Sequence, residues 1–66
     1  MTPPATKPTV KLIGEDGNAF AILGLVTRAL KKAGADKEYT DQYFNDAIAG
    51  DYDQLLYVTM EYVDII

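Results

Sequence analysis

The chain has 66 residues, a formal net charge of −4 and no cysteine or histidine. Its one small core must therefore fold without a disulfide or a zinc site. Serine is also absent from the sequence, so the usual nucleophile–base arrangements cannot be assembled, and we expect a non-enzymatic protein without cofactor or metal. No apolar run approaches the ~20 residues that cross a membrane, and a chain without cysteine is typical of the cytoplasm.

Charge divides the chain into two halves. Residues 1–35 hold five of the six basic side chains, and residues 36–66 hold eight of the ten acidic ones. Such asymmetry favours a protein that meets a charged partner.

The N-terminal residues 1–8 contain all three prolines and no apolar period, which predicts a disordered tail. The alternating, β-branched residues 9–13 (TVKLI) predict a short strand, which needs a mate to satisfy its backbone groups. Residues 62–66 (YVDII) are the other β-like stretch. Pairing the two stretches would close a single domain over residues 9–66.

The longest helical pattern lies within residues 14–34, with Asn18 as its predicted N-cap and Gly34 as its stop. Its apolar face contains Ile22, Leu23, Val26, Ala29, Leu30 and Ala33, and its polar face contains Gly24, Thr27, Arg28, Lys31 and Lys32. A glycine inside a helix costs ~1 kcal/mol relative to alanine. We therefore expect another element to cross closely at Gly24.

Two shorter helices follow, one over about residues 37–49 after Asp36 and one after Asp51. The predicted fold is mainly α: a small three-helix domain with a short N-terminal strand that pairs with the C-terminal residues. The centres of the three apolar faces predict a core of Leu23, Val26, Leu30, Phe44, Ile48, Leu55 and Leu56. Three apolar residues lie outside these faces and predict a dimer contact or docking patch: Leu25, Val58 and Ile65.

Two features resemble nucleic-acid-binding motifs, but the charge of each is unfavourable for binding phosphate. The turn at residues 14–17 (GEDG) precedes a helix, as phosphate- and RNA-clamping loops do, but its two acidic residues would repel phosphate. The last two helices are joined by a short turn, as in a helix-turn-helix. The second of them has no lysine or arginine, so it is poorly suited to DNA.

An acidic stripe is the candidate binding site. Asp53, Tyr57, Glu61 and Asp64 are spaced i, i+4, i+8 and i+11, so one continuous helix would place them on one side. No lysine lies four residues from any of them. A tyrosine flanked by charge is a common interface anchor, which predicts a partner-binding surface. The alternative is an ordinary solvated face.

The segments VKLIGEDGNAF, ILG, RALKKAG and GDYDQLL, between about residues 10 and 63, resemble those of short uncharacterised proteins encoded by phages, prophages and other mobile elements. The resemblance implies a mobile-element origin, a host or phage protein as partner and the cytoplasm of a bacterial host. It brings no catalytic or binding residues. The leading hypothesis is a non-enzymatic protein-interaction module, self-associating or with a foreign partner. The alternatives are an acidic nucleic-acid mimic that inhibits a host defence or replication enzyme and, least favoured, a direct DNA-binding regulator.

Overall fold

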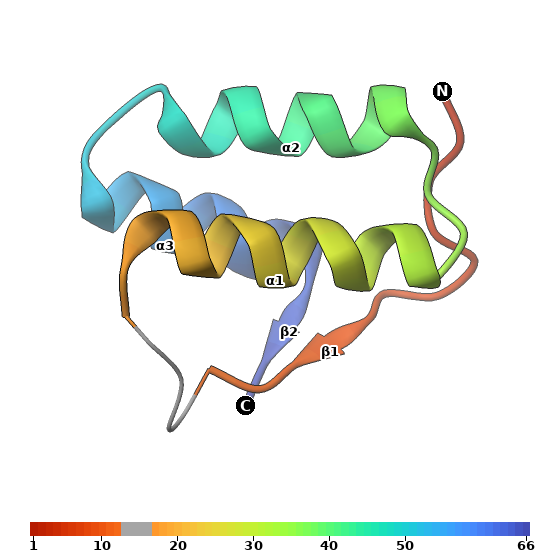
Figure 1. Ribbon diagram of the computed structural model, residues 1–66, viewed down its shortest axis with the longest axis horizontal. Helices are drawn as coiled ribbons and strands as arrows, with labels where there is room; N and C mark the ends of the chain where they lie inside the picture. Colours follow the sequence, from red (N-terminus) through yellow and green to blue (C-terminus); the bar gives the residue numbers. More distant parts are fainter. Residues whose placement is uncertain (13–16) are drawn as a thin grey trace.

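The computed structural model describes residues 1–12 and 17–66, which form three helices and two short strands (Figure 1). In chain order the elements are β1 (Thr9–Val10), α1 (Ala19–Lys32), α2 (Lys37–Ile48), α3 (Tyr52–Tyr62) and β2 (Asp64–Ile65). α1 lies between α2 and the strand pair, and α3 lies behind α1 and α2 (Figure 1). The predicted mainly α fold, with three helices and paired terminal strands, is confirmed.

The two strands pair in parallel, with Thr9 opposite Asp64 and Val10 opposite Ile65. The Ile66 amide donates to the Val10 carbonyl at 3.0 Å, and the Asp64 amide donates to the Pro8 carbonyl at 2.9 Å. Parallel strands need a long crossover, and here the three helices supply it. Both strands are shorter than the predicted stretches, and residue 13 of the first stretch lies outside the described residues.

Polar side chains begin each helix as predicted. The side chains of Asn18, Asp36 and Asp51 accept hydrogen bonds from backbone amides of the first turn of α1, α2 and α3. These bonds satisfy donors that have no partner within the helix. Gly34 follows α1 with φ at 106°, a conformation that favours glycine, and so ends the helix. The predicted turn at residues 14–17 lies mostly outside the described residues.

The core is built where the three helices meet. Its fully buried side chains come from all three helices and the residue that follows α3: Val26, Leu30, Tyr43, Thr59 and Val63. Leu23 and Leu55 are also buried as predicted, whereas Leu56 is only half-buried. The polar side chain of Thr59 can be buried because its hydroxyl forms a 2.8 Å hydrogen bond with the Tyr43 hydroxyl.

The prediction that Phe44 and Ile48 lie in the core is wrong, because they are 38% and 50% exposed. The buried positions of α2 are Thr40, Tyr43 and Ala47. Tyr43 takes the centre of the helix face and bonds to α3, which turns the next residue, Phe44, by ~100° toward the rim.

The three residues predicted to form an outer patch pack inward instead. Val58 is 6% exposed, and Leu25 and Ile65 are half-buried against the core. Val58 therefore belongs to the core rather than to an outer patch, and the dimer contact or docking patch stays a prediction for Leu25 and Ile65. The predicted close crossing at Gly24 is also wrong, since a Cβ added there would have no atom within 4 Å.

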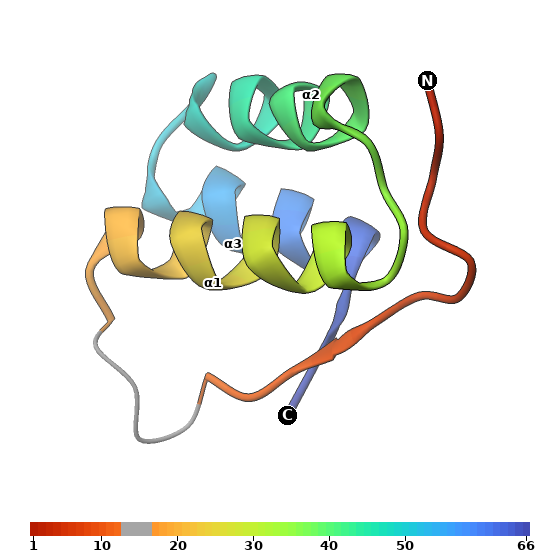
Figure 2. The same ribbon diagram turned by 45° about the vertical axis from the view of Figure 1, so that its right-hand side comes forward.

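The N-terminal residues 1–8 run past the connection between α1 and α2 (Figure 2). The Ala5 amide donates to the Ala33 carbonyl at 2.9 Å, and the Asp36 amide donates to the Thr2 carbonyl at 3.0 Å. The terminal amino group lies 2.9 Å from Glu38 Oε1. These contacts place the segment against the domain. The disorder of residues 1–8 stays a prediction.

Candidate functional site

The acidic stripe is partly preserved. Asp53, Tyr57 and Glu61 are exposed on α3, and Tyr57 is 65% exposed. Asp64 does not continue the stripe, because the backbone leaves the helix at Val63, where φ is −141°, and Asp64 belongs to β2. We call Asp53, Tyr57, Met60 and Glu61 the acidic face. Its role in binding stays a prediction.

The carboxylates of the stripe differ in their surroundings. Lys7 Nζ lies 3.5 Å from Asp64 Oδ1, so that carboxylate has a basic partner from a distant part of the chain. Within residues 1–12 and 17–66, neither Asp53 nor Glu61 takes part in an ion pair. The uncompensated charge is therefore concentrated on α3 itself.

The acidic face also has an apolar component that the sequence analysis did not include. Asp53, Leu56, Tyr57 and Met60 line a shallow depression of about 320 Å³. Met60 is 48% exposed beside it. The face can therefore offer a partner both apolar contact and negative charge.

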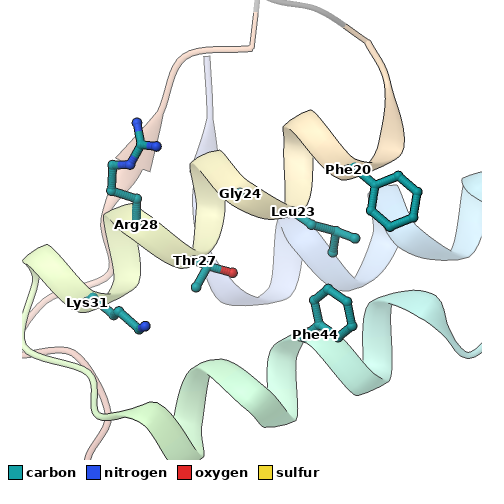
Figure 3. Close-up of a pocket in the computed structure, with 7 residues that line it drawn as sticks. All are labelled: Phe20, Leu23, Gly24, Thr27, Arg28, Lys31 and Phe44. Atoms are coloured by element: carbon teal, nitrogen blue, oxygen red, sulfur yellow. The ribbon is translucent and has the colours of Figure 1, made fainter.

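A larger groove lies between α1 and α2, with a volume of about 490 Å³. We call it the groove; it is lined by Phe20, Leu23, Gly24, Thr27, Arg28, Lys31 and Phe44. Figure 3 shows the Phe20 and Phe44 rings at one end, with Leu23 between them. Lys31 extends toward the groove at the other end, while the Arg28 side chain points away from Phe44 (Figure 3).

The aromatic end of the groove continues into a second depression of about 250 Å³, which shares Phe20 and Leu23 and adds Ile48 and Tyr52. The Tyr52 hydroxyl donates a 2.6 Å hydrogen bond to the Gly17 carbonyl. The exposed apolar residues around the two depressions are Phe20 at 76%, Phe44 at 38%, Ile48 at 50% and Tyr52 at 46%. We call these four residues the aromatic face.

The other end of the groove is basic. Arg28, Lys31 and Lys32 lie in the second half of α1, and Lys11 joins Arg28 and Lys32 around a neighbouring depression. None of these four side chains takes part in an ion pair within the described part of the chain. Lys31 and Lys32 occupy the last turn of α1, where cations complement the helix dipole.

Two tyrosines with a raised hydroxyl pKa lie in the packing between α2 and α3. Burial raises the pKa of the Tyr43 hydroxyl, and burial is also the largest cause of the raised pKa of Tyr62. The Tyr62 ring stacks edge-on against Tyr39 and Tyr43, with centroid distances of 5.6 and 5.1 Å. Its hydroxyl donates to Asp46 Oδ2 at 2.9 Å. This cluster fastens α2 to α3 and faces none of the depressions described above.

Sequence reasoning missed the aromatic face because Phe44 and Ile48 were assigned to the core. One signal was present in α1, where Phe20 and Gly24 are separated by four residues and therefore share a side of the helix. That side also carries Thr27 and Lys31 and is not the apolar face of the helix. The position of Phe20 on the polar side of the helix was therefore the available signal that its ring is exposed.

No family model matches the chain, and searches of curated proteins and solved structures give no significant match. Among the described residues, no group of three or more acidic, histidine or cysteine side chains could hold a metal ion. No helix in that part of the chain is long and apolar enough to cross a membrane.

Proposed function

We propose that this chain is a non-enzymatic protein-interaction module. The supporting observation is the aromatic face, where four large apolar side chains are 38–76% exposed around two adjoining depressions. Contiguous apolar patches on small proteins mark interaction sites, and aromatic side chains dominate binding energy when a partner covers them. The exposure of the Phe20 ring does not stabilise the fold, because it is the burial of an aromatic ring that stabilises a domain.

The resemblance to phage and prophage proteins extends the proposal. It favours a host or phage protein as the partner and the cytoplasm of a bacterial host as the location.

The test is retention of partner proteins from a bacterial lysate by the immobilised chain. Phe20→Ala and Phe44→Ala should each lose the retained protein, because each removes an aromatic contact from the groove. Ile66→Ala is the matched control, since it truncates an exposed apolar side chain that belongs neither to the groove nor to the acidic face. Thermal unfolding of each variant establishes that the fold is intact. Equal retention by the wild type and both phenylalanine variants would contradict the assignment to this face.

The acidic nucleic-acid mimic is the second candidate function. It is favoured by Tyr57, 65% exposed between Asp53 and Glu61, whose carboxylates have no ion-pair partner within the described residues. Carboxylates on a rigid helix suit a groove lined by arginine and lysine. The triple variant with Asn, Gln and Asn at positions 53, 61 and 64 tests this function. A mimic requires weaker partner binding by the variant, and displacement of the wild-type chain by DNA or RNA.

Direct DNA binding is the least favoured function. α3 has no basic side chain. The cations without an ion pair in the described part of the chain are Lys11 and three residues of α1, namely Arg28, Lys31 and Lys32. Binding to DNA requires several basic side chains that contact phosphates and release counterions. An electrophoretic shift of duplex DNA at low salt would revive this alternative.

A further inference from the structure

The groove and the acidic face are complementary in charge and in apolar content. The groove has an aromatic end at Phe20 and Phe44 and a cationic end at Lys31 (Figure 3). The acidic face has an apolar centre at Tyr57 and Met60 and carboxylates on either side. Neither Lys31 nor the flanking carboxylates are neutralised by an ion pair within the described residues.

We propose that the groove receives the acidic face of a second copy of this chain, so that copies join head to tail. This inference rests on the proposed interaction function and names the partner of the groove. Tyr57 and Met60 of one copy lie against Phe20 and Phe44 of the next, and a carboxylate of α3 pairs with Lys31. Water is excluded from the rings, and unlike charges meet at the rim.

The two surfaces have compatible lengths. The groove runs from Phe20 to Lys31, eleven residues along α1, which is ~16 Å at ~1.5 Å per residue. The acidic face runs from Asp53 to Glu61, eight residues along α3, which is ~12 Å. The shorter face therefore fits within the longer groove.

Gly24 gains an explanation from this contact. It lines the groove, and a Cβ added there would meet no atom of its own chain within 4 Å. Its cost to α1 is thus not offset by packing inside the domain. A glycine lets a second helix approach the backbone closely, as small residues do at helix crossings.

A second copy is favoured over a foreign helix because both halves of the contact belong to one chain. The groove is lined by residues of α1 and α2, whereas the depression of the acidic face is lined by residues of α3, so the two surfaces are separate on one chain. The chain exposes 4188 Å², and an interface of standard size takes ~800 Å² from each partner, about a fifth of that surface. There is room for two such contacts, and because they differ, assembly continues beyond a dimer.

Sedimentation velocity on the purified chain tests the proposal. The weight-average mass should rise with concentration from 7.3 kDa past that of a dimer, and it should fall when salt is raised from ~0.05 to ~0.5 M. Gly24→Leu should remain a monomer while its thermal midpoint stays level or rises, because leucine fills the groove and is the better helix former. Loss of association without loss of stability separates a contact role of Gly24 from a folding role.

Mixing two blocked variants gives the sharpest outcome. Gly24→Leu keeps the acidic face, and the double variant Asp53→Lys with Glu61→Lys keeps the groove. Each variant alone should be a monomer, because its affinity for a second copy of itself is weakened by about tenfold or more. A mixture of the two variants should form a 1:1 dimer and nothing larger. If the charge-reversed variant does not fold, Tyr57→Glu replaces it, at a position 65% exposed.

Three results would overturn the head-to-tail contact: a wild-type monomer at every concentration, a closed dimer that Gly24→Leu leaves intact, or a mixture that does not associate. The interaction function fails separately. If the wild type is a monomer but retains a lysate protein that Phe20→Ala loses, the module stands and only the second copy is excluded. If the wild type neither associates nor retains a protein, both proposals fall.

Discussion

The buried hydrogen bond between Tyr43 and Thr59 allows the stability of the domain to be tested one atom at a time. Both side chains are 0% exposed, and their hydroxyl oxygens are 2.8 Å apart. Tyr43→Phe removes one hydroxyl, and Thr59→Val replaces the other with a methyl group of similar volume. Each single change leaves a buried hydroxyl without its partner, which costs ~1–3 kcal/mol.

The expected loss is a large part of the total. A core of this size gives a free energy of unfolding of roughly 3–5 kcal/mol. For so short a domain, each kcal/mol lowers the thermal midpoint by roughly 4–8 °C. Each single variant should therefore melt roughly 5–20 °C below the wild type. The double variant leaves no buried hydroxyl unpaired, so its loss should be well below the sum of the two single losses.

Thermal and urea unfolding of the four proteins, followed by circular dichroism, measures the coupling directly. Tyr57→Phe is the control, because it makes the same chemical change at a position that is 65% exposed, where ~0.5 kcal/mol or less is expected. Additive losses in the double variant would refute the reasoning. So would single variants that melt like the control, because the bond would then contribute nothing to the fold.

Four further predictions concern the core, two glycines and the carboxylate that begins α2. Leu30 is 0% exposed, so Leu30→Ala should lower the free energy of unfolding by ~2–5 kcal/mol and unfold much of the protein. The unfolding should be seen as a loss of helical circular dichroism at room temperature. An unchanged thermal midpoint would contradict the placement of Leu30 in the core. Gly24→Ala should stabilise the chain by ~0.5–1 kcal/mol in urea unfolding, because nothing crowds that position. Gly34→Ala should destabilise it, because φ there is 106°; a stabilising effect would show that the turn is not held as described. Asp36 has a pKa lowered from its ordinary 3.8, chiefly by the hydrogen bond from the Tyr39 amide. A lowered pKa contributes stability that is present above the unfolded value and lost as pH falls through the folded one. The thermal midpoint should therefore drop as the pH falls below the ordinary value of 3.8, and it should drop less in Asp36→Asn.

The acidic face shows how much of the candidate site could be predicted from the sequence. Helical periodicity correctly placed Asp53, Tyr57 and Glu61 together, because neighbours at i and i+4 share a side wherever a helix forms. It failed at Asp64, because the chain leaves the helix to pair with β1. That pairing depends on residues more than fifty positions away, which no local pattern contains. The ion pair of Asp64 with Lys7 depends on the same closure.

The sequence by itself determined which elements form, where each helix begins and where α1 ends. Side chains of Asn18, Asp36 and Asp51 satisfy backbone donors within three residues, and Gly34 adopts a conformation that other residues rarely take. These are local interactions, so they can be read without knowing the fold. The β-branched ends of the chain likewise had only each other to pair with.

Only the tertiary structure decided how α2 is rotated about its axis. A period of 3.6 residues marks an arc of apolar positions in α2 but not its centre, and a rotation of one residue exchanges Tyr43 for Phe44. The centre went to Tyr43 because its hydroxyl finds Thr59 on α3, a bond that exists only after the two helices meet. Phe44 was left on the rim beside Phe20, and the aromatic face is the consequence.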